Sequence, residues 1–201
     1  MGKGWLRASR TDPFLVAAVV LAAASCLHGI GWGRVEDWNP DQMAFQPLFG
    51  EGRAPFNPGW FLKPPFHTYL SWMLAVLPAQ GIAAVLALDP PATRAVSLLL
   101  ARLLTVAMFS GCVVLAYGMA ERACNRFAAR ATAALVATSA GAVAFAHFLT
   151  VDVPVTFWMF LALRFCQRIL VSGAPRDYLW AGVFTGLAAS CKYNGAFVGV
   201  G

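Results

Sequence analysis

The sequence predicts an all-α, polytopic membrane helix bundle with about five transmembrane helices and further helices at the outer surface. Of its 201 residues, 59% are hydrophobic and only 12% are charged. Soluble domains carry about 25% charged residues, so charge this sparse cannot cover a water-facing surface of this size. The apolar residues also form long blocks of the length that spans a bilayer.

Five apolar blocks predict the membrane spans: residues 14–30, 103–120, 131–149, 153–170 and 179–200. The first block follows Lys3, Arg7 and Arg10, a pairing that resembles a secretory signal peptide. The block is long for the apolar part of a signal peptide, which favours an uncleaved first span. Its amino terminus is then expected in the cytoplasm.

A sixth block, residues 69–88, is long enough to cross the membrane. The segment 121–130, however, holds three arginines between two clear spans and should therefore be cytoplasmic. If residues 69–88 crossed fully, this basic segment would face outward. Pro78 interrupts the block, and Tyr69 and Trp72 suit an interfacial helix. Residues 31–96 are therefore predicted to be an extracytoplasmic loop and juxtamembrane region.

Residues 1–201 are predicted to form the amino-terminal part of one membrane domain. The sequence ends within an apolar run, so a carboxy-terminal remainder is expected to be missing. The net charge of +6 could indicate a nucleic-acid partner, but the basic residues lie in short clusters between apolar blocks, which argues against one. The five cysteines lie in or beside these blocks and are predicted to be small buried hydrophobes.

Under this topology several polar residues gather on one side of the membrane. Asp41, Lys63, His67 and Asp152 fall on the outer side, and Lys192 lies toward the outer half of the last span. A lysine suits a phosphate group. A carboxylate can act as a general base toward an acceptor. Together they indicate transfer of a group from a lipid phosphate, although a solvated loop whose charges take no part in chemistry remains an alternative.

The order of these residues resembles the first outer loop of the GT-C-type glycosyltransferases, the protein O-mannosyltransferase and aminoarabinose-transferase-like membrane enzymes. The segments that carry the resemblance are Trp38-Asn-Pro-Asp41-Gln42-Met43, Gly52-Arg-Ala-Pro55 and Lys63-Pro64-Pro65-Phe66-His67. Two later segments agree with it, namely Leu149-Thr-Val-Asp152-Val-Pro154 and Gly186-Leu-Ala-Ala-Ser-Cys-Lys192-Tyr193-Asn. Gln42 departs from the family, which often has glutamate there, so Asp41 is the only carboxylate of that pair.

The resemblance implies a glycosyltransferase of the inner (plasma) membrane, with its active site on the extracytoplasmic side. It would move a sugar from a polyprenyl-phosphate donor to an acceptor that the sequence does not identify. The implied catalytic residues are Asp41, as general base or acceptor-positioning group, and Asp152, as a second acid. The implied substrate-binding residues are Lys63, which would hold the donor phosphate, with His67, Lys192 and Tyr193.

Each of these residues also has a purely structural interpretation. Asp152 could be a helix-end carboxylate, Lys192 could extend to the interface, and His67 could pack as an interfacial ring. The three histidines show no metal-ligand spacing, so no cofactor is predicted to be required, with a divalent cation as a minor alternative. The rival functions are a transporter or flippase, whose sites usually lie near the midplane within inverted repeats, and a noncatalytic scaffold subunit.

Overall fold

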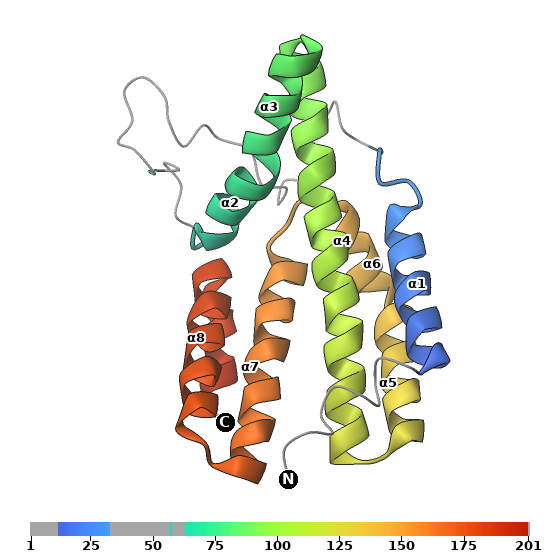
Figure 1. Cartoon of the computed structure of the whole chain (residues 1–201), viewed down its shortest axis with the longest axis vertical. Coiled ribbons are helices and arrows are strands. Elements are labelled where there is room, and N and C mark those ends of the chain that lie inside the picture. The colour runs from blue at the N-terminus through green and yellow to red at the C-terminus, as the bar shows by residue number, and fades with distance from the viewer. Residues whose placement is uncertain (1–11, 33–56, 58–62, 201) are drawn as a thin grey trace.

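The computed structural model describes residues 12–32, 57 and 63–200. All regular secondary structure in this part of the chain is helical, and it contains no β-strand (Figure 1). A membrane helix bundle was predicted, and the described helices confirm it. In chain order they are α1 (Pro13–Leu27), α2 (Phe66–Ser71), the π-helical segment η2 (Trp72–Val76), α3 (Leu77–Leu86), α4 (Pro90–Ala123), α5 (Arg126–Ala137), α6 (Ala140–His147), α7 (Asp152–Ser172), α8 (Pro175–Cys191) and the 3-10 segment η3 (Tyr193–Gly199).

By length and composition, three described helical stretches could cross a membrane: Phe66–Leu86, Pro90–Ala123 and Asp152–Ser172. Helices α5 and α6, which meet at an angle of 46°, could together form a fourth span. Thr138 lies at this bend, and its hydroxyl donates to the carbonyl of Ala134 at 2.8 Å. Such back-bonding from threonine often bends helices, so the predicted span 131–149 is broken. Helix α1 is apolar, but its 15 residues are fewer than the roughly 20 that a membrane span needs.

Helix α4 is the central element of the bundle. Its 34 residues measure about 51 Å, well beyond the ~30 Å of a bilayer's hydrocarbon core. The carboxy-terminal part packs against α1, α5 and α7 through Phe109, Val113 and Tyr117, which meet small buried residues such as Ala22 of α1 and Ala133 of α5. Small residues of this kind let membrane helices approach closely.

The chain alternates between two ends of the bundle (Figure 1). One end holds Asp12, the α4–α5 turn and the α7–α8 turn, and is called the inner end here. The opposite end holds residues 28–32, the α6–α7 turn and Lys192, and is called the outer end. This alternation agrees with the two sides that the loop charges predict, because the arginine-rich segment 121–130 lies at the same end as the start of α1.

At the inner end, Asp12 joins three helices. It caps α1 by accepting a hydrogen bond from the Phe14 amide at 3.0 Å. Its carboxylate also accepts from the Tyr117 hydroxyl at 2.6 Å, from Arg126 Nε at 3.1 Å and from Arg130 Nε at 3.2 Å. The hydrogen bonds from Arg130 and then Tyr117 hold the pKa of Asp12 well below its usual range. The carboxylate therefore stays charged and ties α1 to α4 and α5.

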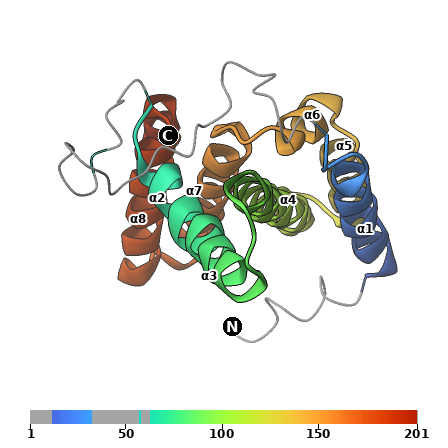
Figure 2. The ribbon, with the colours of Figure 1, turned by 90° about the horizontal axis from the view of Figure 1, so that it is seen from above.

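The stretch from Phe66 to Leu86 is one continuous helix, so Pro78 does not interrupt it as the sequence analysis expected. Proline lacks an N–H, and its ring would crowd the carbonyl four residues earlier in a regular α-helix. The wider π turn of Trp72–Val76 comes just before it and relieves that crowding. Figures 1 and 2 show this helix at the outer end, beside the amino-terminal part of α4. Its predicted interfacial position remains a prediction, because its length and composition would also permit a span.

The last predicted span, residues 179–200, is wrong in its second half. Helix α8 ends at Cys191, and Lys192 has an extended backbone with φ −152° and ψ 133°. The following segment η3 turns back along α8, where Gly195 lies so close to Ala188 that a Cβ atom would clash with the Ala188 carbonyl. Asparagine and glycine, which follow Tyr193, are also poor helix formers.

Candidate functional site

Two residues that the sequence analysis selected come into direct contact at the outer end. Asp152 is the first residue of α7, and Lys192 directly follows the last residue of α8. The ammonium nitrogen Nζ of Lys192 lies 2.7 Å from Oδ1 of Asp152. Forty residues of sequence separate the two, so the antiparallel packing of α7 and α8 is what brings them together.

The local structure explains how Asp152 is held. Leu149, Thr150 and Val151, just before it, are buried and fix the turn that leads into α7. The Thr156 hydroxyl donates to the backbone carbonyl of Asp152 at 2.8 Å. A carboxylate in the first turn is also stabilised by the positive end of the helix dipole. The position of Asp152 is therefore well defined by the fold.

The ion pair is only partly shielded from its surroundings, since the Lys192 and Asp152 side chains are 35% and 31% exposed. Within the described part of the chain, Oδ2 of Asp152 accepts no hydrogen bond, and the Lys192 ammonium donates one. A lysine has three N–H donors and a carboxylate has two acceptor oxygens. Asp152 and Lys192 can therefore stay hydrogen-bonded to each other while Oδ2 of Asp152 and the remaining N–H donors of Lys192 bind a ligand.

An apolar pocket of about 520 Å³ reaches Asp152 from between α4, α5, α6 and α7. Its lining includes the rings of Phe109, Phe145 and Phe160, and the bend between α5 and α6 brings Ser139 to it. Asp152 is the acidic residue among those that line it. An apolar space with one charged residue in its wall suits an amphipathic ligand with a polar head and an apolar chain.

Helix α2 brings the residues after the first outer loop toward this pair. The Phe66 ring lies 5.9 Å from the Trp158 ring of α7, and it also packs beside Val155 and Cys191. Val155 lies one turn after Asp152, and Cys191 directly precedes Lys192. Lys63, three residues before Phe66, is consequently held at the same end of the bundle as the ion pair.

The remaining predicted residues have different surroundings. Tyr193 begins η3 and is 65% exposed, beside Lys192. His67 is fully buried; its Nε2 lies 3.3 Å from the Ser71 hydroxyl, and its Nδ1 has no hydrogen-bond partner among the described residues. Its surroundings are those of a packed ring, and its predicted contact with substrate stays a prediction. Asp41 lies outside the described residues.

The sequence analysis assigned no role to Arg102 and His147, which hold the outer end of α1. The buried Arg102 donates from Nη1 to the carbonyls of Ile30 and Trp32, at 2.7 and 2.6 Å. The two ring nitrogens of His147 lie 2.7 Å from the carbonyl of His28 and 2.8 Å from that of Val143. Both residues therefore fix the point from which the first outer loop leaves the bundle. An arginine inside an apolar helix was the signal that could have identified Arg102.

Metal binding finds no support in the described residues, which contain no group of three or more His, Cys, Asp or Glu side chains able to hold an ion. This observation does not extend to Asp41 and its neighbours.

Residues 92–201 match the family model of the dolichyl-phosphate-mannose-protein mannosyltransferases. The chain belongs to this family. No curated protein and no solved structure gives a significant match. The mannosyltransferase family match covers α4 to η3, including the Asp152–Lys192 pair, and it begins after Lys63. Membership in this family, together with the apolar helices, identifies the chain as a multi-pass membrane protein of the glycosyltransferase class.

Proposed function

We propose that this protein transfers a sugar from a polyprenyl-phosphate carrier to an acceptor at the outer face of the membrane. The observation that carries the proposal is the Asp152–Lys192 ion pair, at 2.7 Å, at the outer end of α7 and α8. Asp152 lines an apolar pocket, and the pair lies at the same end as Lys63. A lipid-linked sugar phosphate needs this combination of cationic, acidic and apolar surfaces.

In the proposed reaction, an acceptor hydroxyl or amine attacks the anomeric carbon of the donor sugar. Asp41 takes the proton of the acceptor as general base, a role that typically contributes about 10²–10⁴-fold in rate. The bond between the anomeric carbon and the phosphate oxygen breaks, and its electron pair leaves with the polyprenyl phosphate. Asp152 is the second acidic group of the site and helps to position the acceptor.

The leaving phosphate gains negative charge as that bond breaks. Lys63 and Lys192 are the two lysines near the outer end of the described bundle, and each can donate charge-assisted hydrogen bonds to the phosphate oxygens. Such donors accelerate the reaction because they act on charge that develops in the transition state. Asp152 keeps the Lys192 ammonium fixed at the end of α8 before donor binds, which lowers the cost of ordering it.

The apolar pocket beside Asp152 offers room for the start of the polyprenyl chain. This pocket lies between α4, α5, α6 and α7. With the chain in the pocket, the phosphate would lie near Asp152, to which Lys192 is paired.

The rival function is a transporter or flippase. Transporters usually bind substrate near the bilayer midplane, between broken helices of two inverted repeats. The Asp152–Lys192 pair lies instead at the ends of α7 and α8. Family membership and the position of the pair therefore both favour transfer chemistry over transport.

The test compares Asp41→Asn with Asp37→Asn, a matched change in the same loop. Membranes that contain the parent or a variant at equal abundance are incubated with a polyprenyl-phosphate sugar labelled in the sugar. Asp41→Asn should lower transfer to acceptor by at least about 100-fold, because the amide cannot take a proton, while Asp37→Asn should stay near the parent. Near-parental activity of Asp41→Asn would show that the general base has been assigned wrongly.

A further inference from the structure

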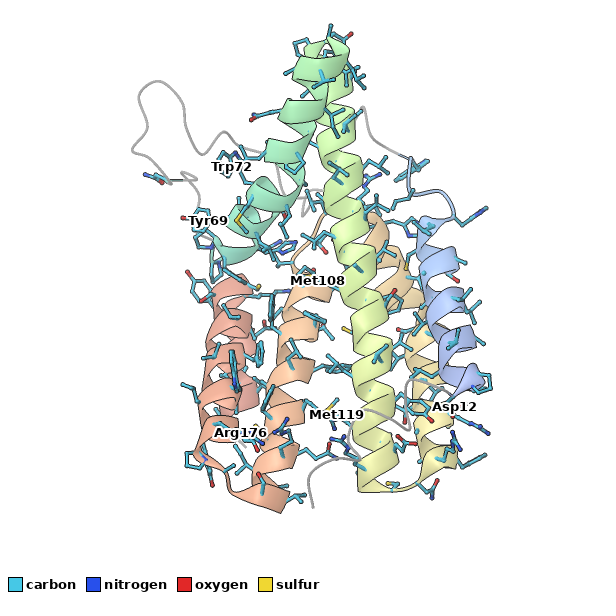
Figure 3. The ribbon with its side chains drawn as sticks, in the orientation of Figure 1. Asp12, Tyr69, Trp72, Met108, Met119 and Arg176 are labelled. Carbon is cyan, nitrogen blue, oxygen red and sulfur yellow. The ribbon has the colours of Figure 1, made fainter. Side chains whose placement is uncertain are left out.

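A second pocket lies in the hairpin that α3 and α4 form at the outer end of the bundle. Figure 1 shows the tip of this hairpin beyond the ends of the other described helices, and Figure 3 labels Tyr69 and Trp72 at its base. The pocket has a volume of about 480 Å³, within the roughly 300–1,000 Å³ of small-molecule sites. Its lining comes from η2, α3, the turn that follows α3 and the start of α4: Val76, Gln80, Leu88, Pro90, Thr93, Arg94 and Ser97. It is called the hairpin pocket here.

The length of α4 places the hairpin pocket outside the hydrocarbon core. Arg122 lies in the last turn of α4, at the inner end, where an arginine side chain can extend to the headgroups. Ser97 precedes it by 25 residues, or about 38 Å of helix, which is about 36 Å across the membrane at an average tilt of about 20°. The hydrocarbon core is about 30 Å thick, so the pocket lies in the outer headgroup layer or in water. Its occupant is therefore a polar molecule and not a lipid chain.

The two hydroxyl groups of the hairpin pocket can only accept further hydrogen bonds. The Thr93 hydroxyl donates to the carbonyl of Asp89 at 2.8 Å, and the Ser97 hydroxyl donates to the carbonyl of Thr93 at 2.9 Å. Each hydroxyl has one proton, so its oxygen is left as an acceptor toward a ligand. The Gln80 amide can donate and accept, and the Arg94 guanidinium can only donate. A matching ligand must therefore supply donors as well as acceptors.

This combination favours a sugar ring over other polar ligands. An ionised phosphate group has no proton to donate, so it would meet two hydroxyl oxygens that have no hydrogen bond to offer it. A cationic ligand could donate to those oxygens, but the positive charge of Arg94 disfavours it. Each hydroxyl of a sugar both donates and accepts. The C–H faces of the ring suit Val76, Leu88 and Pro90, which form the apolar part of the lining.

The hairpin pocket adjoins the turn that leads to Asp152. Leu98, which directly follows Ser97, belongs to one buried apolar cluster with Ala75 of η2 and Leu149. Leu149 lies three residues before Asp152. One layer of apolar side chains therefore separates the pocket from the turn that positions the acidic residue of the candidate site.

We propose that the hairpin pocket holds a sugar ring of the acceptor, so that the acceptor of the transfer reaction is a glycan. This inference rests on the proposed function and adds the class of acceptor to it. With one ring in the pocket, a hydroxyl of a neighbouring ring attacks the anomeric carbon of the donor sugar. The proton of that hydroxyl passes to the general base, the polyprenyl phosphate leaves, and a glycosidic bond between two sugars forms.

Transfer by the complete protein in vesicles tests the inference. The donor is a polyprenyl-phosphate sugar labelled in the sugar, and the acceptor is a cell-envelope extract quantified by its carbohydrate content. Partial acid hydrolysis of the product should release label as a disaccharide. Gln80→Leu and Thr93→Val keep the side-chain size but remove hydrogen-bonding groups, so each should raise the apparent KM for the extract about three- to tenfold at unchanged donor KM.

Thr105→Val is the matched control. The Thr105 hydroxyl likewise donates to the carbonyl four residues earlier on α4, at 3.1 Å, but Thr105 is not among the residues that line either pocket. This variant should leave both KM values unchanged. Gln80 is exposed, so Gln80→Leu should fold normally, and it decides the test if Thr93→Val does not accumulate.

Three results would overturn the inference while the proposed function stands. Label attached directly to an amino acid or to a lipid phosphate would show another class of acceptor. An unchanged apparent KM for the extract in Gln80→Leu, or an equal rise in Thr105→Val, would show that the hairpin pocket does not hold the acceptor. The absence of any transfer by the parent would overturn the proposed function and this inference together.

Discussion

Replacing Lys192 by methionine removes the ammonium that lies 2.7 Å from Asp152, while a long apolar side chain remains. About a third of each side chain is exposed, so the pair is partly screened by its surroundings. Exposed pairs of this kind stabilise a fold by about 0.2–1 kcal/mol. A charge-assisted hydrogen bond to a substrate is stronger, about 1.5–3 kcal/mol. The substitution should therefore affect donor use more than it affects stability.

With about 1.4 kcal/mol for each factor of ten, loss of a phosphate contact lowers kcat/KM for the donor by about 10- to 150-fold. The assay measures sugar transfer from a polyprenyl-phosphate donor over a range of donor concentrations, with thermal unfolding of the same preparations as the stability control. Lys192→Met should reduce kcat/KM within that range and leave the unfolding temperature within a few degrees of the parent value.

The charge-reversed double variant Asp152→Lys with Lys192→Asp separates chemistry from structure. It restores an ion pair at the same place but exchanges the two charges. If the pair serves only to join α7 and α8, the double variant should regain the activity that either single change loses. Recovery to near the parent rate would refute the assigned roles, whereas continued inactivity with normal stability supports them.

Three further predictions concern other parts of the chain. Lys63→Ala should weaken apparent donor affinity about tenfold or more at unchanged protein abundance, and equal affinity in a donor titration would exclude the phosphate contact. In a background without the native cysteines, an impermeant thiol reagent on intact cells should label cysteine at position 86 but not at position 126, and the reverse pattern would contradict the topology. The lowered pKa of Asp12 means that its stabilisation is complete above the ordinary carboxyl pKa of about 4 and is lost as pH falls below that value. Asp12→Asn should thus lower the unfolding temperature at neutral pH and flatten its dependence on pH in acid, and an unchanged acid profile would count against this role.

Much of the helical layout could be predicted because it depends on composition and on loop charge. The apolar blocks at 14–30 and 153–170 lie within two or three residues of α1 and α7. The arginines of segment 121–130 predicted which helix ends share a side, and the structure has the same alternation. These features follow from the bilayer, which restricts helix length and favours basic residues on one side.

The contacts between distant residues could not be predicted in the same way. The sequence analysis put Asp152 and Lys192 on the outer side, but their contact depends on α8 ending at Cys191, inside a segment that was predicted to be one continuous span. Arg102 meets carbonyls some 70 residues away in sequence, and Asp12 meets guanidinium groups 114 and 118 residues away. Asp12 carried a local signal, because an aspartate before a proline is typical of a helix start, and Arg102 stood out as an arginine inside an apolar helix, but neither signal identifies the distant partner.

Reconstituting the complete protein in vesicles that contain a polyprenyl-phosphate sugar, with label in both the sugar and the lipid, separates transfer from transport most directly. A cell-envelope extract supplies acceptors on one side only. If the outer end of the bundle is a glycosyltransferase site, sugar label should leave the lipid and enter the acceptor fraction while an equal amount of polyprenyl phosphate forms, and Asp41→Asn should stop both. Movement of the intact doubly labelled lipid between leaflets, with no sugar released to any acceptor, would contradict the proposed function and favour a flippase.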